Sequence, residues 1–131
     1  MRLKFLICTL ALLIAPLALS AQNAIDKAMD EYSSIGKSTF TSAVERDPNT
    51  RKVLKVVKVL QPTDITINRL RRAFLNEQKN GQFSLVTNEE EETITLTVES
   101  SKENRVYMMQ YTRRGASYSN GKVTIIIKYK Q

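Results

Sequence analysis

The sequence predicts an α+β fold in which two helices pack on one face of an antiparallel sheet. Three observations lead to this prediction. Segments 22–33 and 63–81 repeat apolar residues at helical spacing, whereas the chain from residue 81 onward alternates apolar and polar residues. The connections between the later segments are short, which favours antiparallel pairing. The expected order is helix, strand, strand, helix and then about four strands of ordinary length.

Residues 1–20 are expected to be a signal peptide that is cleaved on export. Two basic residues precede the apolar run 5–19, and Ala18 and Ser20 fit the small residues of a signal peptidase site. A membrane anchor is the alternative, but the run is short and no basic cluster follows it. Residues 21–131 are therefore expected to form a single domain in the periplasm or outside the cell, with no integral membrane segment.

Composition excludes several classes of chemistry. The chain has no His, and its only Cys, Cys8, lies in the predicted signal peptide. Catalysis by Ser-His-Asp or Cys-His groups and zinc sites made of His and Cys are thereby excluded. An exported chain without disulfides is typical of a bacterial envelope protein. Without residues 1–20 the chain holds 18 basic and 13 acidic residues, a net charge of +5, which favours encounters with polyanions without naming one.

The first helix and the following hairpin are predicted from spacing and turn residues. In segment 22–33 the apolar stripe consists of Ile25, Ala28, Met29 and Tyr32. Segment 37–45 is rich in Thr and places Phe40 and Val44 on one face. The segment 47–50 reads Asp-Pro-Asn-Thr, which indicates a turn between two strands.

Segment 51–62, RKVLKVVKVLQP, fits two structures. As a helix it would have a basic face and a valine stripe, which is typical of a membrane-active peptide. As a strand it places Val53, Lys55, Val57 and Val59 on one face and Leu54, Val56, Lys58 and Leu60 on the other. We favour the strand, because Val loses rotamer freedom in a helix and the preceding turn begins a hairpin. The helical alternative predicts that the protein permeabilises liposomes.

Segment 63–81 is the second helix. Its apolar stripe is Ile67, Leu70 and Phe74, flanked by Ala73. Thr63 or Asp64 is expected to cap its first amide groups, and Gly81 is expected to end it in a left-handed conformation.

The rest of the chain alternates with a period of two and predicts a meander of strands. The expected strands are 81–87, 93–99, 105–112 and 122–130. Ile94, Leu96 and Val98 should face the core. Asn120-Gly121 is expected to form a tight hairpin turn, since both residues tolerate positive φ.

Two charged segments are candidates for binding. Arg113 and Arg114, near Tyr107, Tyr111 and Tyr118, could bind an anionic glycan or a lipid headgroup, because Arg forks hold phosphate or carboxylate and Tyr side chains stack. The alternative is a charged loop beside strand aromatics. Nucleic acid is not an expected partner, since an exported protein seldom meets it.

The acidic run Asn88 to Glu92 could bind calcium through carboxylate oxygens, but it lacks the alternating Asp residues and the Gly of a compact calcium loop. We therefore interpret it as a solvated hairpin tip, and whether it binds a cation stays open. No glycine-rich phosphate loop occurs, and we expect neither a cofactor nor an enzymatic activity.

The segments ALSAQ and AIDKAMDEYS, the strand pair, the helix with Ala73 and Phe74, and the closing meander resemble small secreted domains of unknown function from Bacteroidetes. This resemblance spans most of residues 21–131. It implies a bacterial envelope or secreted protein and no particular activity. We expect a binding domain that recognises a protein or envelope component through its sheet face or edge, with a polyanion-binding surface as the alternative.

Overall fold

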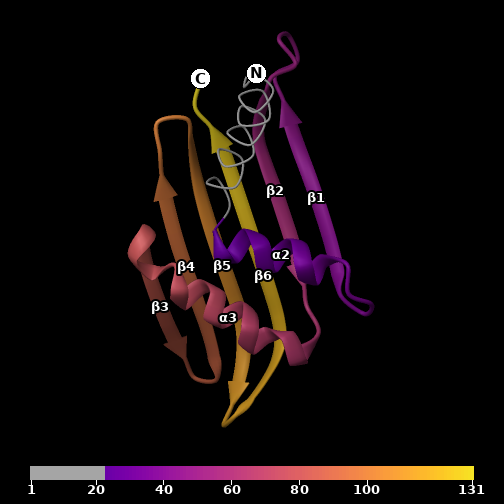
Figure 1. Ribbon diagram of the computed structural model, residues 1–131, viewed down its shortest axis with the longest axis vertical. Helices are drawn as coiled ribbons and strands as arrows, with labels where there is room; N and C mark the ends of the chain where they lie inside the picture. Colours follow the sequence, from indigo (N-terminus) through magenta and orange to yellow (C-terminus); the bar gives the residue numbers. More distant parts are fainter. Residues whose placement is uncertain (1–22) are drawn as a thin grey trace, which may run out of the picture.

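The computed structural model describes residues 23–131, which form two α-helices and one six-stranded antiparallel sheet (Figure 1). The predicted α+β class and antiparallel sheet are confirmed. The predicted signal peptide, residues 1–20, lies outside the described residues. The elements in chain order are α2 (Ala24–Ser33), β1 (Thr39–Arg46), β2 (Val53–Gln61), the 3₁₀ turn η1 (Asp64–Thr66), α3 (Ile67–Asn76), the 3₁₀ turn η2 (Gln78–Asn80), β3 (Gln82–Asn88), β4 (Glu91–Glu99), β5 (Glu103–Arg114) and β6 (Ser117–Tyr129).

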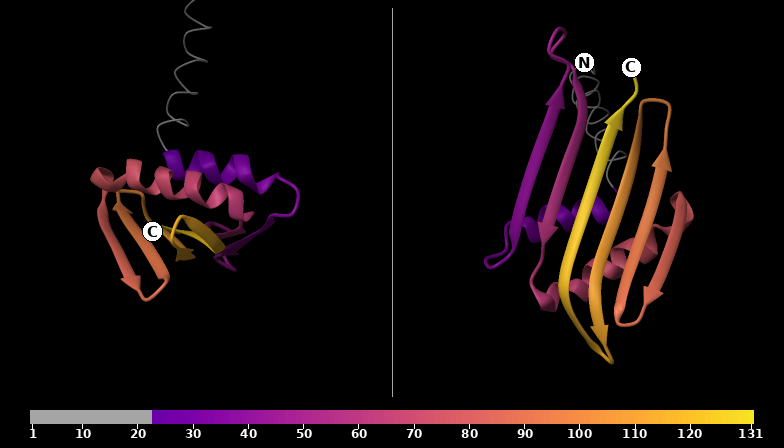
Figure 2. Two further views of the ribbon diagram at one scale, coloured as in Figure 1. Left: turned by 90° about the horizontal axis from the view of Figure 1, so that it is seen from below. Right: turned by 180° about the vertical axis from the view of Figure 1, so that it is seen from behind.

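The strands lie in the order β1-β2-β6-β5-β4-β3. The final strand, β6, therefore inserts between β2 and β5 and joins the early hairpin to the later meander. Figure 2 shows that α2 and α3 lie side by side across the same face of the sheet, so the molecule has two layers. The opposite face, which we call the open face, has no helix over it among the described residues.

The core lies between the helices and the sheet. The core consists of the predicted apolar stripes of α2 and α3 and of alternate side chains from the strands. Its largest fully buried side chains are Tyr107, Tyr111, Phe74, Ile25, Met29, Leu60, Ile67, Leu70, Ile94, Leu96, Met109 and Ile125. The alternation predicted for 93–99 is confirmed in β4, where Ile94 and Leu96 are fully buried and Val98 packs against the core.

The helix starts differ from one another. The Asn23 side chain accepts a hydrogen bond from the Asp26 amide, and Asp26 bonds back to the Asn23 amide, so α2 begins with a capping box. The second helix has no such cap, and the prediction that Thr63 or Asp64 would supply one is wrong. Instead the chain enters α3 through η1, where the Thr66 hydroxyl donates to the Thr63 carbonyl at 2.8 Å.

Segment 51–62 forms strand β2 between β1 and β6, as predicted. Leu60 faces the helices and is fully buried, whereas Lys55 is on the open face, paired in register with Lys128. The valines of this segment are held in the sheet and do not form a helical stripe. Within residues 23–131, every helix is too short or too polar to cross a bilayer.

Asn120-Gly121 does not form the hairpin turn that the sequence predicts. Both residues lie within β6, and the turn between β5 and β6 contains Gly115, which has a φ of +59°. Asn120 has a φ of +53°, and the register of β5 with β6 shifts between Gln110 and Thr112. Asn120 and Gly121 therefore form a β-bulge opposite Tyr111, and the positive φ of Asn120 is part of that bulge.

Gly81 also differs from its predicted role. Its φ is −177°, which is extended and not left-handed. A Cβ atom at this position would lie 2.3 Å from the carbonyl oxygen of Thr97 on the neighbouring strand. Gly81 therefore allows two backbones to approach closely at the start of β3.

Candidate functional site

Three of the five predicted ligand contacts lie together near the β5–β6 turn. Arg113 and Tyr118 are register partners, and the Arg113 guanidinium lies 5.6 Å from the centroid of the Tyr118 ring. The Tyr118 ring in turn packs edge-on against Tyr111, with 5.4 Å between the ring centroids. This arrangement combines a cation–π contact with an aromatic pair.

Tyr111 is at the centre of a polar network beneath this cluster. Its hydroxyl accepts a hydrogen bond of 2.7 Å from Nε of Arg71 and donates one to the Glu92 carboxylate. Arg113 Nη1 lies 3.4 Å from the other oxygen of Glu92. Glu92 is 7% exposed, so the interpretation of the whole acidic run as a solvated tip is wrong for this residue. Glu89 to Glu91 are exposed, as expected of a tip.

The charge states of this network follow from its contacts. Burial alone would raise the pKa of Glu92, but the Tyr111 hydrogen bond and the charges of Arg71 and Arg113 outweigh it, and the pKa is lowered. Burial, followed by the bond to the Glu92 carboxylate, raises the pKa of Tyr111 to about 12. Both groups therefore keep one charge state near neutral pH, which does not suit acid–base catalysis.

Arg114 lies beside this cluster and is more exposed. Its Nε is 3.1 Å from the Glu90 carboxylate, and both side chains are largely in solvent. Arg113 and Arg114 thus each have an acidic partner, in Glu92 and Glu90. A phosphate or carboxylate ligand would compete with these partners for the two guanidinium groups.

Tyr107, the fifth predicted contact, belongs to a different cluster. Its hydroxyl donates to Asp26 of α2 at 3.1 Å and accepts from Nη1 of Arg105 at 3.3 Å. Nε of Arg105 also pairs with Glu103. Strand β5 therefore carries two similar arrangements, in which a buried Tyr accepts from an Arg and donates to a carboxylate. Tyr107 and Tyr111 are only 1% and 2% exposed.

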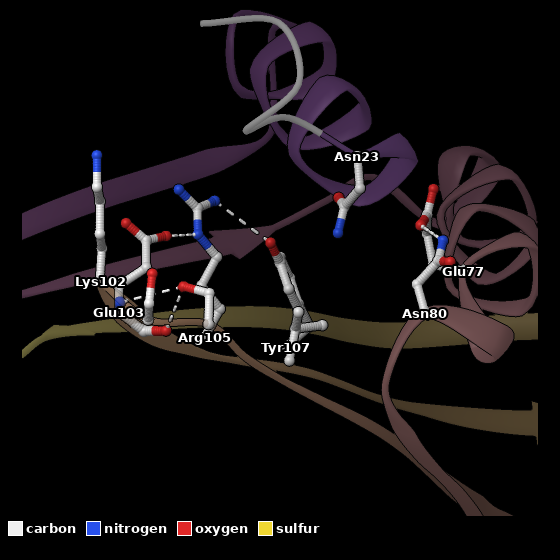
Figure 3. A pocket seen from close by; sticks show the side chains of 10 residues that line it. Asn23, Glu77, Asn80, Lys102, Glu103, Arg105 and Tyr107 are labelled. Carbon is white, nitrogen blue, oxygen red and sulfur yellow. Dashed lines mark hydrogen bonds and ion pairs between the residues drawn. The ribbon is translucent and has the colours of Figure 1, made fainter. Parts of the chain in front are cut away.

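A pocket of about 470 Å³ opens beside Tyr107, between the start of α2, the end of α3 and the turn between β4 and β5 (Figure 3). It is lined by Asn23, Glu77, Asn80, Val98, Ser100, Ser101, Lys102, Glu103, Arg105 and Tyr107. Some of its polar groups already bond to other protein groups: Glu77 accepts from the Ala24 amide at 2.9 Å and from the Asn80 side chain. The bond to Ala24 ties the start of α2 to the residue that follows α3.

Metal chemistry has no obvious place in the described part of the chain. Residues 23–131 contain no group of three or more His, Cys, Asp or Glu side chains placed to hold a metal ion. The carboxylates of Asp26, Glu90 and Glu92 are each paired with an Arg.

The open face of the sheet carries an apolar patch at its centre. Val57, Ile126 and Val106 lie opposite one another on β2, β6 and β5, and Val59 and Met108 flank Thr124 in the next row. We call Val57, Val59, Val106, Met108 and Ile126 the open-face patch. Each of these side chains is half-buried by its neighbours in the sheet and contacts no helix layer, because the register points it away from the core.

A row of charged residues borders the open-face patch at one end. Lys55 and Lys128 are register partners on β2 and β6, and Glu45 lies opposite Lys55 on β1. Like charges directly opposite each other destabilise a sheet. An acidic group placed over this lysine pair would relieve the repulsion.

Comparisons with known proteins identify no relative. No protein-family model matches the chain, and neither the curated proteins nor the solved structures include a match.

The sequence predicted recognition through a sheet face or edge but did not identify the residues of the open-face patch, although a signal for them was present. Segment 51–62 alternates imperfectly, with valine on both faces, and Val106, Met108 and Ile126 fall on the polar side of their strands. The role of Glu92 had no local signal, because its partners Arg71 and Arg113 come from distant parts of the chain.

Proposed function

We propose that this chain is an exported, non-enzymatic binding domain of a bacterial envelope, and that it recognises a protein through the open face of its sheet. The single observation that supports this most is the open-face patch. Soluble domains usually cover or interrupt a contiguous apolar surface, and an uncovered one is typical of an interaction site. Export is proposed from the pattern of residues 1–20.

The surroundings of the patch define the partner's chemistry. Thr side chains of β4 and β6 lie beside the open-face patch. The Lys55–Lys128 pair borders one of its ends. A partner with an apolar centre and an acidic rim would bury the valines and neutralise the lysines together. A pleated sheet surface with an apolar centre suits another sheet or an amphipathic helix.

The test compares Ile126→Lys with Ile65→Lys. Ile126 is in the open-face patch, whereas Ile65 is 87% exposed in η1 on the helix side, so both variants add the same charge to the same parent residue. The immobilised protein is incubated with an envelope extract of the bacterium that encodes it, and captured proteins are quantified. We expect the Ile65→Lys variant to capture what the parent captures and the Ile126→Lys variant to lose it.

The same assay distinguishes docking on the open-face patch from the alternative function, polyanion binding through Arg113, Arg114 and nearby Lys residues. Binding to an anionic glycan or a lipid headgroup should weaken steeply as salt rises above about 0.15 M, where the Debye length is about 8 Å. Docking on the open-face patch should largely persist. Capture that is unchanged by Ile126→Lys but lost in salt and in an Arg113→Gln/Arg114→Gln variant would replace the proposal with this alternative.

A further inference from the structure

Strand β1 forms one edge of the sheet and is uncovered along its whole length. Figure 1 shows β1 at the outer edge of the sheet, and all eight of its residues are exposed. On the helix side of the sheet, Phe40 is 37% exposed and Val44 is 51% exposed, because α2 and α3 cover the more central strands. From Thr39 to Val44 the strand contains neither a charged residue nor a proline, which are the usual means of blocking an edge.

The apolar residues of β1 are arranged symmetrically. Phe40 and Val44 lie two residues before and two residues after Ser42, and all three side chains share one face. If a second copy of β1 runs antiparallel with Ser42 opposite Ser42, Phe40 of each copy lies opposite Val44 of the other. Thr41 then lies opposite Ala43 on the other face. The strand is therefore complementary to itself in this one register.

The other edge of the sheet lacks this property. Strand β3 also has two exposed apolar residues, Leu85 at 38% and Val86 at 58%. Their adjacent positions put them on opposite faces of the sheet, so they cannot form one apolar strip. The residue that shares the helix side with Leu85, Phe83, is already packed against the core.

We propose that two copies of this chain associate edge to edge through β1, antiparallel and centred on Ser42. The pairing joins two six-stranded sheets into one continuous sheet, with unpaired backbone groups of both edges hydrogen-bonded across the symmetry axis. On the helix side, two pairs of Phe40 with Val44 close over the axis. Aromatic residues opposite β-branched ones are among the favourable cross-strand pairs. This surface is separate from the open-face patch, so the two proposals can fail independently.

The register is tested by cysteine cross-linking. In a parent in which Cys8→Ser removes the only native Cys, Ser42→Cys places the single thiol on the proposed axis. Paired residues on neighbouring antiparallel strands have Cβ atoms about 4.5–5.5 Å apart, close enough for a disulfide after small adjustments. Ser84→Cys, an exposed serine on the β3 edge, is the matched control. We expect mild oxidation to convert Ser42→Cys to a covalent dimer and to leave Ser84→Cys monomeric.

Association is measured by sedimentation velocity over a concentration series. We compare the parent with Val44→Lys and with Val86→Lys, which replace the exposed valines of the two edge strands. Each substitution acts twice in a symmetric dimer, so Val44→Lys should weaken association at least about tenfold. Val86→Lys should leave the dissociation constant within about twofold, because it lies outside the proposed contact. Both positions are exposed, so neither variant should unfold.

Each other outcome overturns the proposal. A parent that stays monomeric at every concentration shows that β1 is not a self-association edge. Dimerisation that survives Val44→Lys, or that is lost in Val86→Lys, places the contact elsewhere. Cross-linking of Ser84→Cys with none of Ser42→Cys assigns the contact to β3.

Discussion

The Tyr107 hydroxyl donates a hydrogen bond of 3.1 Å to Oδ2 of Asp26, which joins β5 to the first turn of α2. Nη1 of Arg105 contacts the same oxygen at 3.2 Å, and Asp26 also completes the capping box of α2. One carboxylate therefore holds the start of a helix, an arginine and a buried phenol. This contact ties the first turn of α2 to the central strand β5 and so helps to hold the helix layer on the sheet.

Tyr107→Phe tests this contact. The substitution keeps the ring in the core and removes only the hydroxyl, so we expect the free energy of unfolding to fall by about 1–2 kcal/mol. Urea unfolding at neutral pH is the measurement. Tyr129→Phe is the control: the Tyr129 ring also packs against the core, but its hydroxyl takes no part in the Asp26 contact, so stability should change by less than about 0.5 kcal/mol. Equal losses in the two variants would show that the Asp26 bond contributes nothing.

Glu92 should make the protein sensitive to acid. Its pKa in the folded state is lower than the ordinary 4.5, so its contribution is present above about pH 4.5 and is lost as pH falls through the folded-state pKa. Glu92→Gln should destabilise the protein at neutral pH and remove part of the acid-induced loss. Glu90→Gln, at the exposed pair with Arg114, should leave the profile unchanged because solvent screens that pair. Unfolding free energies measured from pH 7 to pH 3 decide between these outcomes.

Tyr107 and Tyr111 should determine the response to alkali. Burial raises the pKa of each to about 12, above the ordinary value of 10.0. A raised folded-state pKa gives stability that is complete below pH 10 and is lost as pH rises toward 12. We expect tyrosinate absorbance to show two late-titrating groups, one of which disappears in Tyr107→Phe and one in Tyr111→Phe. Titration of both residues with an ordinary pKa would contradict the burial described for β5.

Gly81→Ala should destabilise the protein through a backbone clash. The new Cβ would lie 2.3 Å from the Thr97 carbonyl oxygen, so β3 must shift relative to β4. We expect a loss of about 1–3 kcal/mol, as for other substitutions that overpack a site. Gly36→Ala is the matched control, since its added Cβ meets no atom within 4 Å beyond the neighbouring residues of the chain, and it should change stability by less than about 1 kcal/mol. Thermal unfolding of the two variants under the same conditions provides the comparison.

Local patterns were sufficient wherever one short segment determines its own structure. The stripe of α2 follows from helical spacing, and the inward residues of β4 follow from strict alternation. The turn after β1 follows from Asp47, whose Oδ1 accepts from the amides of Asn49 and Thr50. In each case the physical cause lies within a few residues, so the sequence alone carries it.

Tertiary structure decided the features that depend on distant partners. The φ of Asn120 suited a hairpin turn as well as a bulge, and only pairing with β5 selected the bulge. Tyr107 and Tyr111 lie four residues apart on one strand, yet Asp26 and Glu92 draw them into different clusters. The insertion of β6 beside β2 assembles the open-face patch from three strands and leaves β1 at an edge. By itself the sequence determined the positions of the helices and most of the strands, while the export signal in residues 1–20 stays a prediction. Which surfaces remain uncovered depends on strand order, and strand order is set by packing between segments far apart in the chain.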